Sequence, residues 1–123
     1  MKKLLIGILF LFVTVSAQAA WFTGGIVTNP AANAILADAG AQTIESGHDF
    51  DVCVSSTVAT AFVIEWRDAT NTANVWSHIV PIAANGFVCF TSRGSLTMLV
   101  GERIRVRQNS AATGSVQASI NYF

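Results

Sequence analysis

Three arginines alternate with apolar residues close to the C-terminus, in the stretch GERIRVRQ at 101–108. On an extended strand Arg103, Arg105 and Arg107 would share one face, about 6.5–7 Å apart along the strand. A guanidinium group presents a fork of donors that matches planar and tetrahedral anions. This arginine row is therefore a candidate contact for sulfate, phosphate or uronate groups.

An ordinary strand explains the same pattern without a ligand. Ile104 and Val106 would face the core, while the arginines stay solvated or pair across strands with a carboxylate such as Glu65 or Glu102. We favour this interpretation because the chain carries a small net negative charge once a predicted export signal at 1–19 is removed, and such a charge is poorly suited to anions.

A second polar stretch, ESGHDFD at 45–51, holds three carboxylates near a glycine. Glu45, Asp49 and Asp51 could supply oxygen ligands to calcium, which takes about six to eight of them. The spacing fits no EF-hand loop, and the alternation of Asp49 and Asp51 suits the start of a strand. We expect a hairpin turn here and no metal site.

Residues typical of a catalytic centre are scarce. His48 and His78 are the only histidines, and no serine lies in a G-x-S-x-G elbow. Glu65 has no second carboxylate in its own strand with which to form an acid–base pair. We therefore expect a protein that is not an enzyme and needs no cofactor.

The N-terminal residues have the features of an export signal. A basic pair precedes an almost wholly apolar run from 4 to 15, and Ala17 and Ala19 then fit the small pockets of a signal peptidase. The run is shorter than the ~20 residues that a helix needs to cross a bilayer. We predict a signal peptide at 1–19 and one mature domain at 20–123 with no stable membrane span; retention of the apolar segment stays open.

Removal of that segment changes the charge balance. The chain has seven basic and seven acidic residues, and the two lysines lie in the predicted signal, which leaves five arginines against seven acidic residues. The mature net charge is then about −2. A lysine-free, slightly acidic domain is poorly suited to nucleic acid or anionic membranes, so we expect neither as a partner.

Alternation of apolar and polar residues dominates the chain from residue 47 onward. The alternating runs are five to nine residues long, and short turns rich in Gly, Asn and Ser separate them. This pattern predicts an all-β fold, a single antiparallel β-sandwich of about eight strands, with jelly-roll and immunoglobulin-like topologies both open. Pro81 lacks an amide hydrogen, which places its run on a sheet edge or at a bulge.

The segment 30–39 departs from this pattern. Asn29 suits a helix N-cap, Pro30 the first helical position and Gly40 the end, and the alanine-rich sequence between them has good helix propensity. A short strand at AILA, 34–37, is the alternative, because an all-β environment can override propensity. The sequence favours a short helix and leaves the strand open.

Two cysteines, Cys53 and Cys89, are present in a chain predicted to be exported. Oxidising conditions outside the cytosol favour a disulfide between them. On the chain-entropy estimate, closing a loop of this length stabilises a fold by roughly 3.5–4 kcal/mol. A pair of buried free thiols is the alternative.

The two ends of the mature chain carry the candidate interface residues. The stretch 21–28, WFTGGIVT, alternates weakly, and its glycines make it a poor independent strand. Apolar side chains on edge strands are templates for pairing between subunits. We expect residues 20–28 to contact a neighbouring subunit; the alternative is that they form the first strand of their own sandwich. The candidate contacts are Trp21, Phe22, Ile26, Tyr122 and Phe123.

High apolarity, low charge and the lack of a catalytic group favour a structural subunit of an extracellular or cell-surface assembly, such as a filament, coat or virion component. Such a subunit would associate with copies of itself or with other subunits. The alternative is a secreted or periplasmic carbohydrate-binding module. In it Trp21 or Trp76 would stack on a sugar ring beside the arginine row.

Overall fold

The computed structural model describes residues 20–42, 46–92 and 96–122, so the predicted signal peptide lies outside the described residues. These residues form eleven strands and contain no helix. The strands are β1 (Ala20–Thr23), β2 (Val27–Thr28), β3 (Ile35–Asp38), β4 (Ser46–His48), β5 (Phe50–Ser56), β6 (Thr60–Arg67), β7 (Asn74–Ile82), β8 (Gly86–Thr91), β9 (Leu96–Met98), β10 (Arg103–Gln108) and β11 (Ser115–Tyr122).

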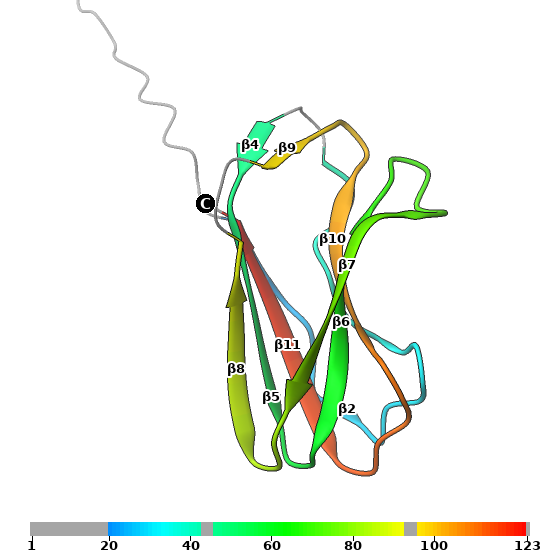
Figure 1. The fold of residues 1–123 in the computed structure, drawn as a ribbon, viewed down its shortest axis with the longest axis vertical. Helices are drawn as coiled ribbons and strands as arrows, with labels where there is room; N and C mark the ends of the chain where they lie inside the picture. The colour runs from blue at the N-terminus through cyan, green and yellow to red at the C-terminus, as the bar shows by residue number, and fades with distance from the viewer. Residues whose placement is uncertain (1–19, 43–45, 93–95, 123) are drawn as a thin grey trace, which may run out of the picture.

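Two antiparallel sheets form the two layers of a β-sandwich (Figure 1). Sheet A has the order β1-β11-β5-β8, with β2 also paired to β11, and sheet B has the order β3-β10-β6-β7. A small ribbon of β4 and β9 lies at one end of the molecule. The predicted fold class is therefore confirmed. The strand number exceeds the expected eight because β1 and β2 occupy one edge position in succession and the ribbon is additional.

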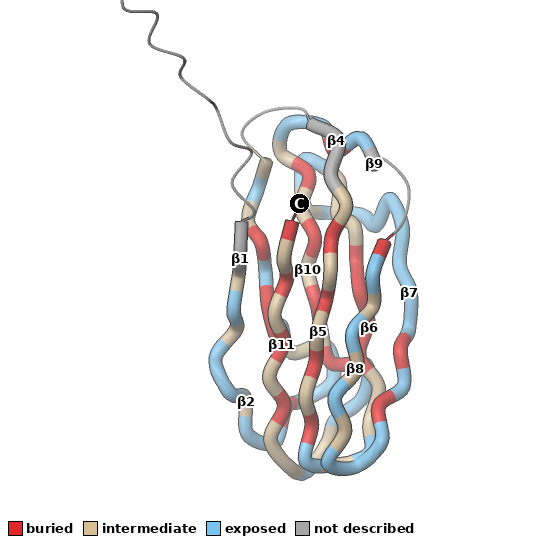
Figure 2. Tube along the Cα trace, turned by 90° about the vertical axis from the view of Figure 1, so that its left-hand side faces the viewer, coloured by how far each residue is buried: buried red, intermediate tan, exposed pale blue. Residues whose placement is uncertain are grey.

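The core follows from the alternation in the sequence. Buried and part-exposed residues alternate along β5, β10 and β11, as Figure 2 shows by colour. Burying such apolar side chains stabilises the fold by roughly 25 cal/mol per Å² removed from water. The inward apolar residues of these three strands are Phe50, Val52, Val54, Ile104, Val106, Val116, Ala118, Ile120 and Tyr122.

The helix favoured for 30–39 is wrong, and the alternative strand is present. Residues 35–38 form β3, which pairs antiparallel with β10. Asn33 has a φ of 65°, and its amide donates to the carbonyl of Gln108 at 3.0 Å, so the backbone already follows β10 at that point. Pairing with β10 and burial of Leu36 outweigh the modest helix propensity of the alanines.

The N-terminal segment completes its own domain, which corrects the expected exchange with a neighbour. β1 pairs with β11 from Ala20 opposite Tyr122, and β2 pairs with the start of the same strand. Between them the amide of Gly24 donates to the carbonyl of Ala118 at 2.9 Å. A Cβ atom at Gly24 would overlap the carbonyl oxygen of Leu36, so only glycine lets β3 approach this closely.

Candidate functional site

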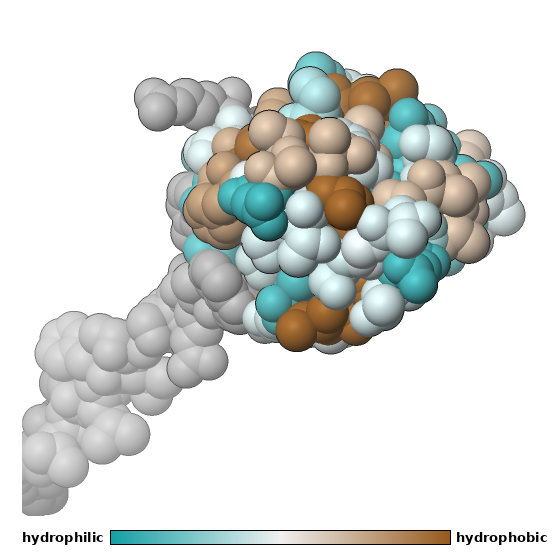
Figure 3. All heavy atoms as spheres, turned by 90° about the horizontal axis from the view of Figure 1, so that it is seen from below, coloured by the Kyte–Doolittle hydropathy of each residue, from teal (hydrophilic) through white to brown (hydrophobic). Residues whose placement is uncertain are grey.

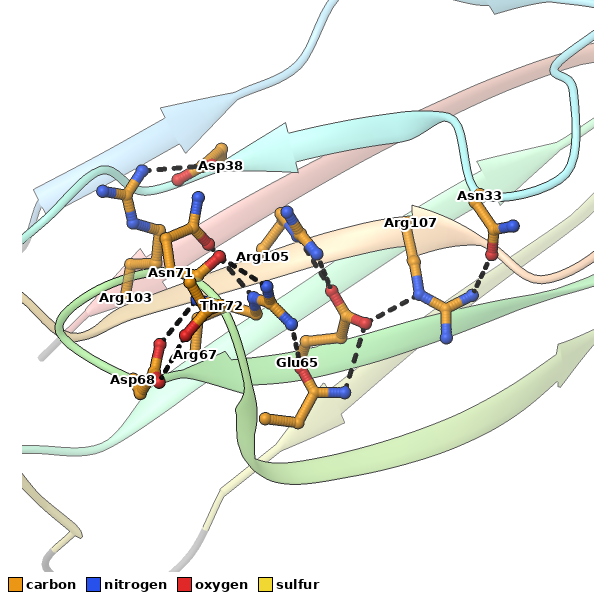
Figure 4. Close-up of polar contacts among 11 residues, drawn as sticks. Asn33, Asp38, Glu65, Arg67, Asp68, Asn71, Thr72, Arg103, Arg105 and Arg107 are labelled. Carbon is orange, nitrogen blue, oxygen red and sulfur yellow. Dashed lines mark hydrogen bonds and ion pairs between the residues drawn. The ribbon is translucent and has the colours of Figure 1, made fainter.

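The arginine row lies on the outer face of sheet B around one buried carboxylate (Figure 4). Glu65 is only 2% exposed. Its Oε2 accepts from Nε and Nη2 of Arg105 at 2.8 and 2.6 Å, and its Oε1 accepts from Nε of Arg107 at 2.7 Å. Two of the three arginines therefore hold an internal partner, which is the cross-strand pairing expected for an ordinary strand.

These contacts set the protonation of Glu65. Burial by itself raises the pKa of its carboxyl group, but the hydrogen bonds from Arg107 and Arg105 and the charge of Arg105 outweigh burial. The pKa consequently lies below its ordinary value, and the carboxylate stays ionised at neutral pH.

Arg103 and Arg67, which also lie on this face, have hydrogen-bond or ion-pair partners within the protein. Arg103 pairs with Asp38 at 3.6 Å. Arg67 donates from Nε to Oδ1 of Asn71 at 3.0 Å and from Nη1 to Oδ1 of Asn74 at 2.7 Å, so it braces the turn between β6 and β7. An external anion would have to compete with these partners, and an anion contact at the arginine row stays a prediction.

Glu102, the other carboxylate considered as a partner for the arginine row, is used elsewhere. Its Oε2 accepts from Nε1 of Trp66 and from the amide of Leu99, each at 2.9 Å. Trp66 is thereby fixed at the edge of the core, against which it packs.

A hollow of about 370 Å³ opens between β7 and β8, where the edges of the two sheets separate. Trp66 and Trp76 line it from sheet B, and Phe50 and Phe90 line it from sheet A. The Trp76 and His78 rings are stacked at 17° with centroids 5.9 Å apart, and the Phe90 ring lies 5.8 Å from Trp76. This aromatic hollow has no charged residue among its described lining residues, so it suits a neutral, flat ring.

The alternating pattern of β7 puts Trp76 and His78 on one face, but it does not reveal the hollow. The alternation of β7 was the available signal, whereas the partners Phe50 and Phe90 come from strands of the other sheet. Only the packing of the two sheets brings these rings together.

The candidate interface residues at the chain ends have separate positions. Tyr122 faces the core of its own domain: its hydroxyl accepts from the amide of Ile104 at 3.1 Å, and burial raises its pKa to about 12. Phe22 is part-buried and meets the Tyr122 ring edge-on, 5.7 Å between centroids. The side chain of Trp21 and all of Phe123 lie outside the described residues.

Ile26 remains on the surface, with 68% of its area exposed. Together with Phe87, which is 69% exposed, it flanks a shallow hollow on the outer face of sheet A. Seen from the end that carries the β5–β6 and β7–β8 turns, hydrophobic residues form separate patches among more hydrophilic ones (Figure 3).

Cys53 and Cys89 form the predicted disulfide. They stand opposite each other on β5 and β8 and point to the outer face of sheet A, away from the core. The bond therefore fastens the edge strand β8 to its neighbour rather than joining the two sheets.

Within residues 20–42, 46–92 and 96–122, no three His, Cys, Asp or Glu side chains are grouped to hold a metal ion. The part of the chain that the structure describes also contains no helix long and apolar enough to span a membrane.

No protein-family description and no curated protein matches this chain. Among solved structures it is similar to the globular domain of zebrafish complement 1qA protein, with a TM-score of 0.51 and 12% sequence identity. The match covers 84% of this chain and 94% of that one. At this identity the likeness extends to the fold alone, a β-sandwich.

Proposed function

We propose that this protein is a non-catalytic structural subunit of an extracellular or cell-surface assembly and associates with copies of itself. The observation that carries the proposal is β7, an edge strand of sheet B with no Asp, Glu, Lys or Arg in its nine residues. Most edge strands are protected from pairing by charges, short length or bulges. β7 lacks such charges along its whole length.

Apolar side chains are exposed along this strand. Val75 is 54% exposed and Ile79 56%, while Trp76 borders the aromatic hollow beside them. In Figure 2 β7 lies at one side of the molecule, coloured exposed over most of its length. A large, uncharged, apolar edge is the kind of surface that a protein covers by association.

The disulfide and the predicted signal peptide support a location outside the cytosol. Disulfides persist in oxidising compartments, and Cys53 and Cys89 are the only cysteines of the chain. The predicted signal peptide at 1–19 is consistent with export.

The mass of the exported protein in solution tests the proposal. We expect light scattering after size-exclusion chromatography to give a multiple of the chain mass, with the multimer fraction rising with concentration. A monomer at every concentration, with or without salt, would contradict self-association.

A carbohydrate-binding module is the second candidate, and the aromatic hollow favours it. Tryptophan faces stack on the apolar side of sugar rings, and Thr91 and Ser92 also line the hollow. Glycan-array binding that is lost in Trp76→Ala and retained in Phe87→Ala would support this function. Absence of binding to any glycan would remove it.

A further inference from the structure

The pattern of hydrogen bonds in sheet B shows which backbone groups of β7 face outward. The carbonyl of Ala61 accepts from the amide of Asn109 at 3.0 Å, so this residue of β6 bonds toward β10. Its partner in β7 is Pro81, which has no amide hydrogen to offer. Since the bonding direction alternates along a strand, Ser77 and Ile79 direct their amide and carbonyl groups to the open edge.

Two features limit the stretch that can pair regularly. The pairing register between β6 and β7 shifts between Trp66 and Arg67 of β6. This shift makes Val75 the extra, bulged residue of β7. At the other end Pro81 cannot donate outward. The segment from Trp76 to Val80 lies between these limits, and His78 is its centre.

We infer that β7 pairs antiparallel with β7 of a second copy, about a two-fold axis at His78. This inference rests on the proposed self-association and identifies β7 as its interface. Ser77 of one copy then lies opposite Ile79 of the other, and these two residues exchange backbone hydrogen bonds on each side of the axis.

The charges of the strand are compatible with this arrangement. The segment contains no Asp, Glu, Lys or Arg, so no carboxylate, ammonium or guanidinium group meets a like charge when two identical edges pair. Joining them extends the four-stranded sheet B of each copy into one continuous sheet through the dimer. The two aromatic hollows then lie on the same side of the joint, because Trp76 and His78 share one face of β7.

A charge comparison at Ser77 and Ile79 tests the pairing, since both side chains are exposed. In Ser77→Lys/Ile79→Lys, like charges face each other twice across the axis, and we expect the dimer to be lost. In Ser77→Lys/Ile79→Glu, opposite charges face each other, and we expect the dimer to be retained. Ala31→Lys/Ala111→Lys adds the same charge as the first variant at exposed loop positions and should leave the dimer intact.

The outcomes separate the two proposals. If the double-lysine variant is as dimeric as the unmodified chain, the β7 pairing is overturned while self-association through another surface stands. If the Lys/Glu variant is as monomeric as the double-lysine variant, the register about His78 is overturned. If the unmodified chain is monomeric, both proposals fail.

Ser77→Pro gives a second measurement that introduces no charge. It removes an outward amide hydrogen, as Pro81 already does in the same strand, and it should weaken the dimer while the circular dichroism of the sandwich is retained. A dimer of unchanged affinity in this variant would contradict the hydrogen bonding proposed across the axis.

Discussion

At the scale of single residues, Glu65 explains two members of the arginine row, Arg105 and Arg107. A carboxylate that is almost fully buried on a sheet face is costly unless it is paired, and Arg105 and Arg107 together occupy both of its oxygens. The arginines are accordingly only about one-fifth exposed, at 17% and 23% of their side-chain areas. Their main role in the fold is to compensate the buried negative charge of Glu65.

The depressed pKa of Glu65 predicts how stability depends on pH. A carboxylate whose pKa is lower in the folded state contributes stability above its unfolded value, near 4.5, and loses that contribution as the pH falls through the folded value. We expect the urea concentration at the unfolding midpoint of the unmodified protein to decrease as the pH is lowered below this value. Glu65→Gln should be less stable by about 1–3 kcal/mol at pH 7 and should show a smaller decline in acid. Parallel pH curves for the two proteins would contradict the role of Glu65.

Substitution of Arg105 distinguishes the paired arginine of the structure from the solvated arginine that the alternating pattern alone would give. A solvated arginine tolerates replacement within about 0.5 kcal/mol, whereas Arg105 supplies two hydrogen bonds to a buried carboxylate. We expect Arg105→Ser to lower the free energy of unfolding by about 1–3 kcal/mol, measured by urea denaturation. Val106→Asp, which buries an unpaired charge, should unfold the domain. A fully tolerated Arg105→Ser would show that Arg107 alone satisfies Glu65.

At the scale of elements, the two edge strands on the open side of the sandwich are secured differently. β8 is joined to β5 by the Cys53–Cys89 disulfide, whereas β7 is held by its pairing with β6 and by the aromatic contacts of Trp76 and His78 with Phe90. The covalent bond therefore fixes one wall of the aromatic hollow.

Loss of the disulfide should loosen β8 before the rest of the sandwich. We expect Cys53→Ser/Cys89→Ser to reduce the free energy of unfolding by up to about 4 kcal/mol. Amide exchange should accelerate in β8 more than in the central strand β6. The unmodified protein, denatured without reductant, should show no titratable thiol. Two free thiols per chain under those conditions would contradict the bond.

At the scale of the whole molecule, the segment 20–28 closes sheet A. Within this segment, β1 and β2 pair in succession with the free edge of β11, and Phe22 packs against the core beside Tyr122. Removing it would expose the edge of β11 and the core residues beneath.

Deletion of residues 20–28 is therefore expected to prevent stable folding. Near-ultraviolet circular dichroism and the thermal transition of the truncated protein measure this outcome. A folded, monomeric product would contradict it and would restore the view that the segment belongs to a neighbouring subunit. Deletion of the predicted signal alone, residues 1–19, is the control and should leave the fold intact.

Local patterns in the sequence determined which faces of the strands are buried and where one edge lies. A period of two assigns side chains to faces without reference to a partner, which is why the inward residues of β5, β10 and β11 were predictable. Pro81 likewise indicated a sheet edge or a bulge, because it has no amide hydrogen to donate, and β7 is an edge strand. The cysteines indicated their own bond, since they are the only two in the chain.

Tertiary structure decided which strands meet and therefore what the surface offers. β3 is a strand because β10 supplies its hydrogen bonds, and β1 belongs to its own sheet because β11 lies beside it. Glu65 is buried because arginines from a strand about forty residues away cover it. The aromatic hollow exists because β7 and β8, from different sheets, diverge at one side. Each of these outcomes depends on contacts between distant segments, whose free energy no local propensity or period contains.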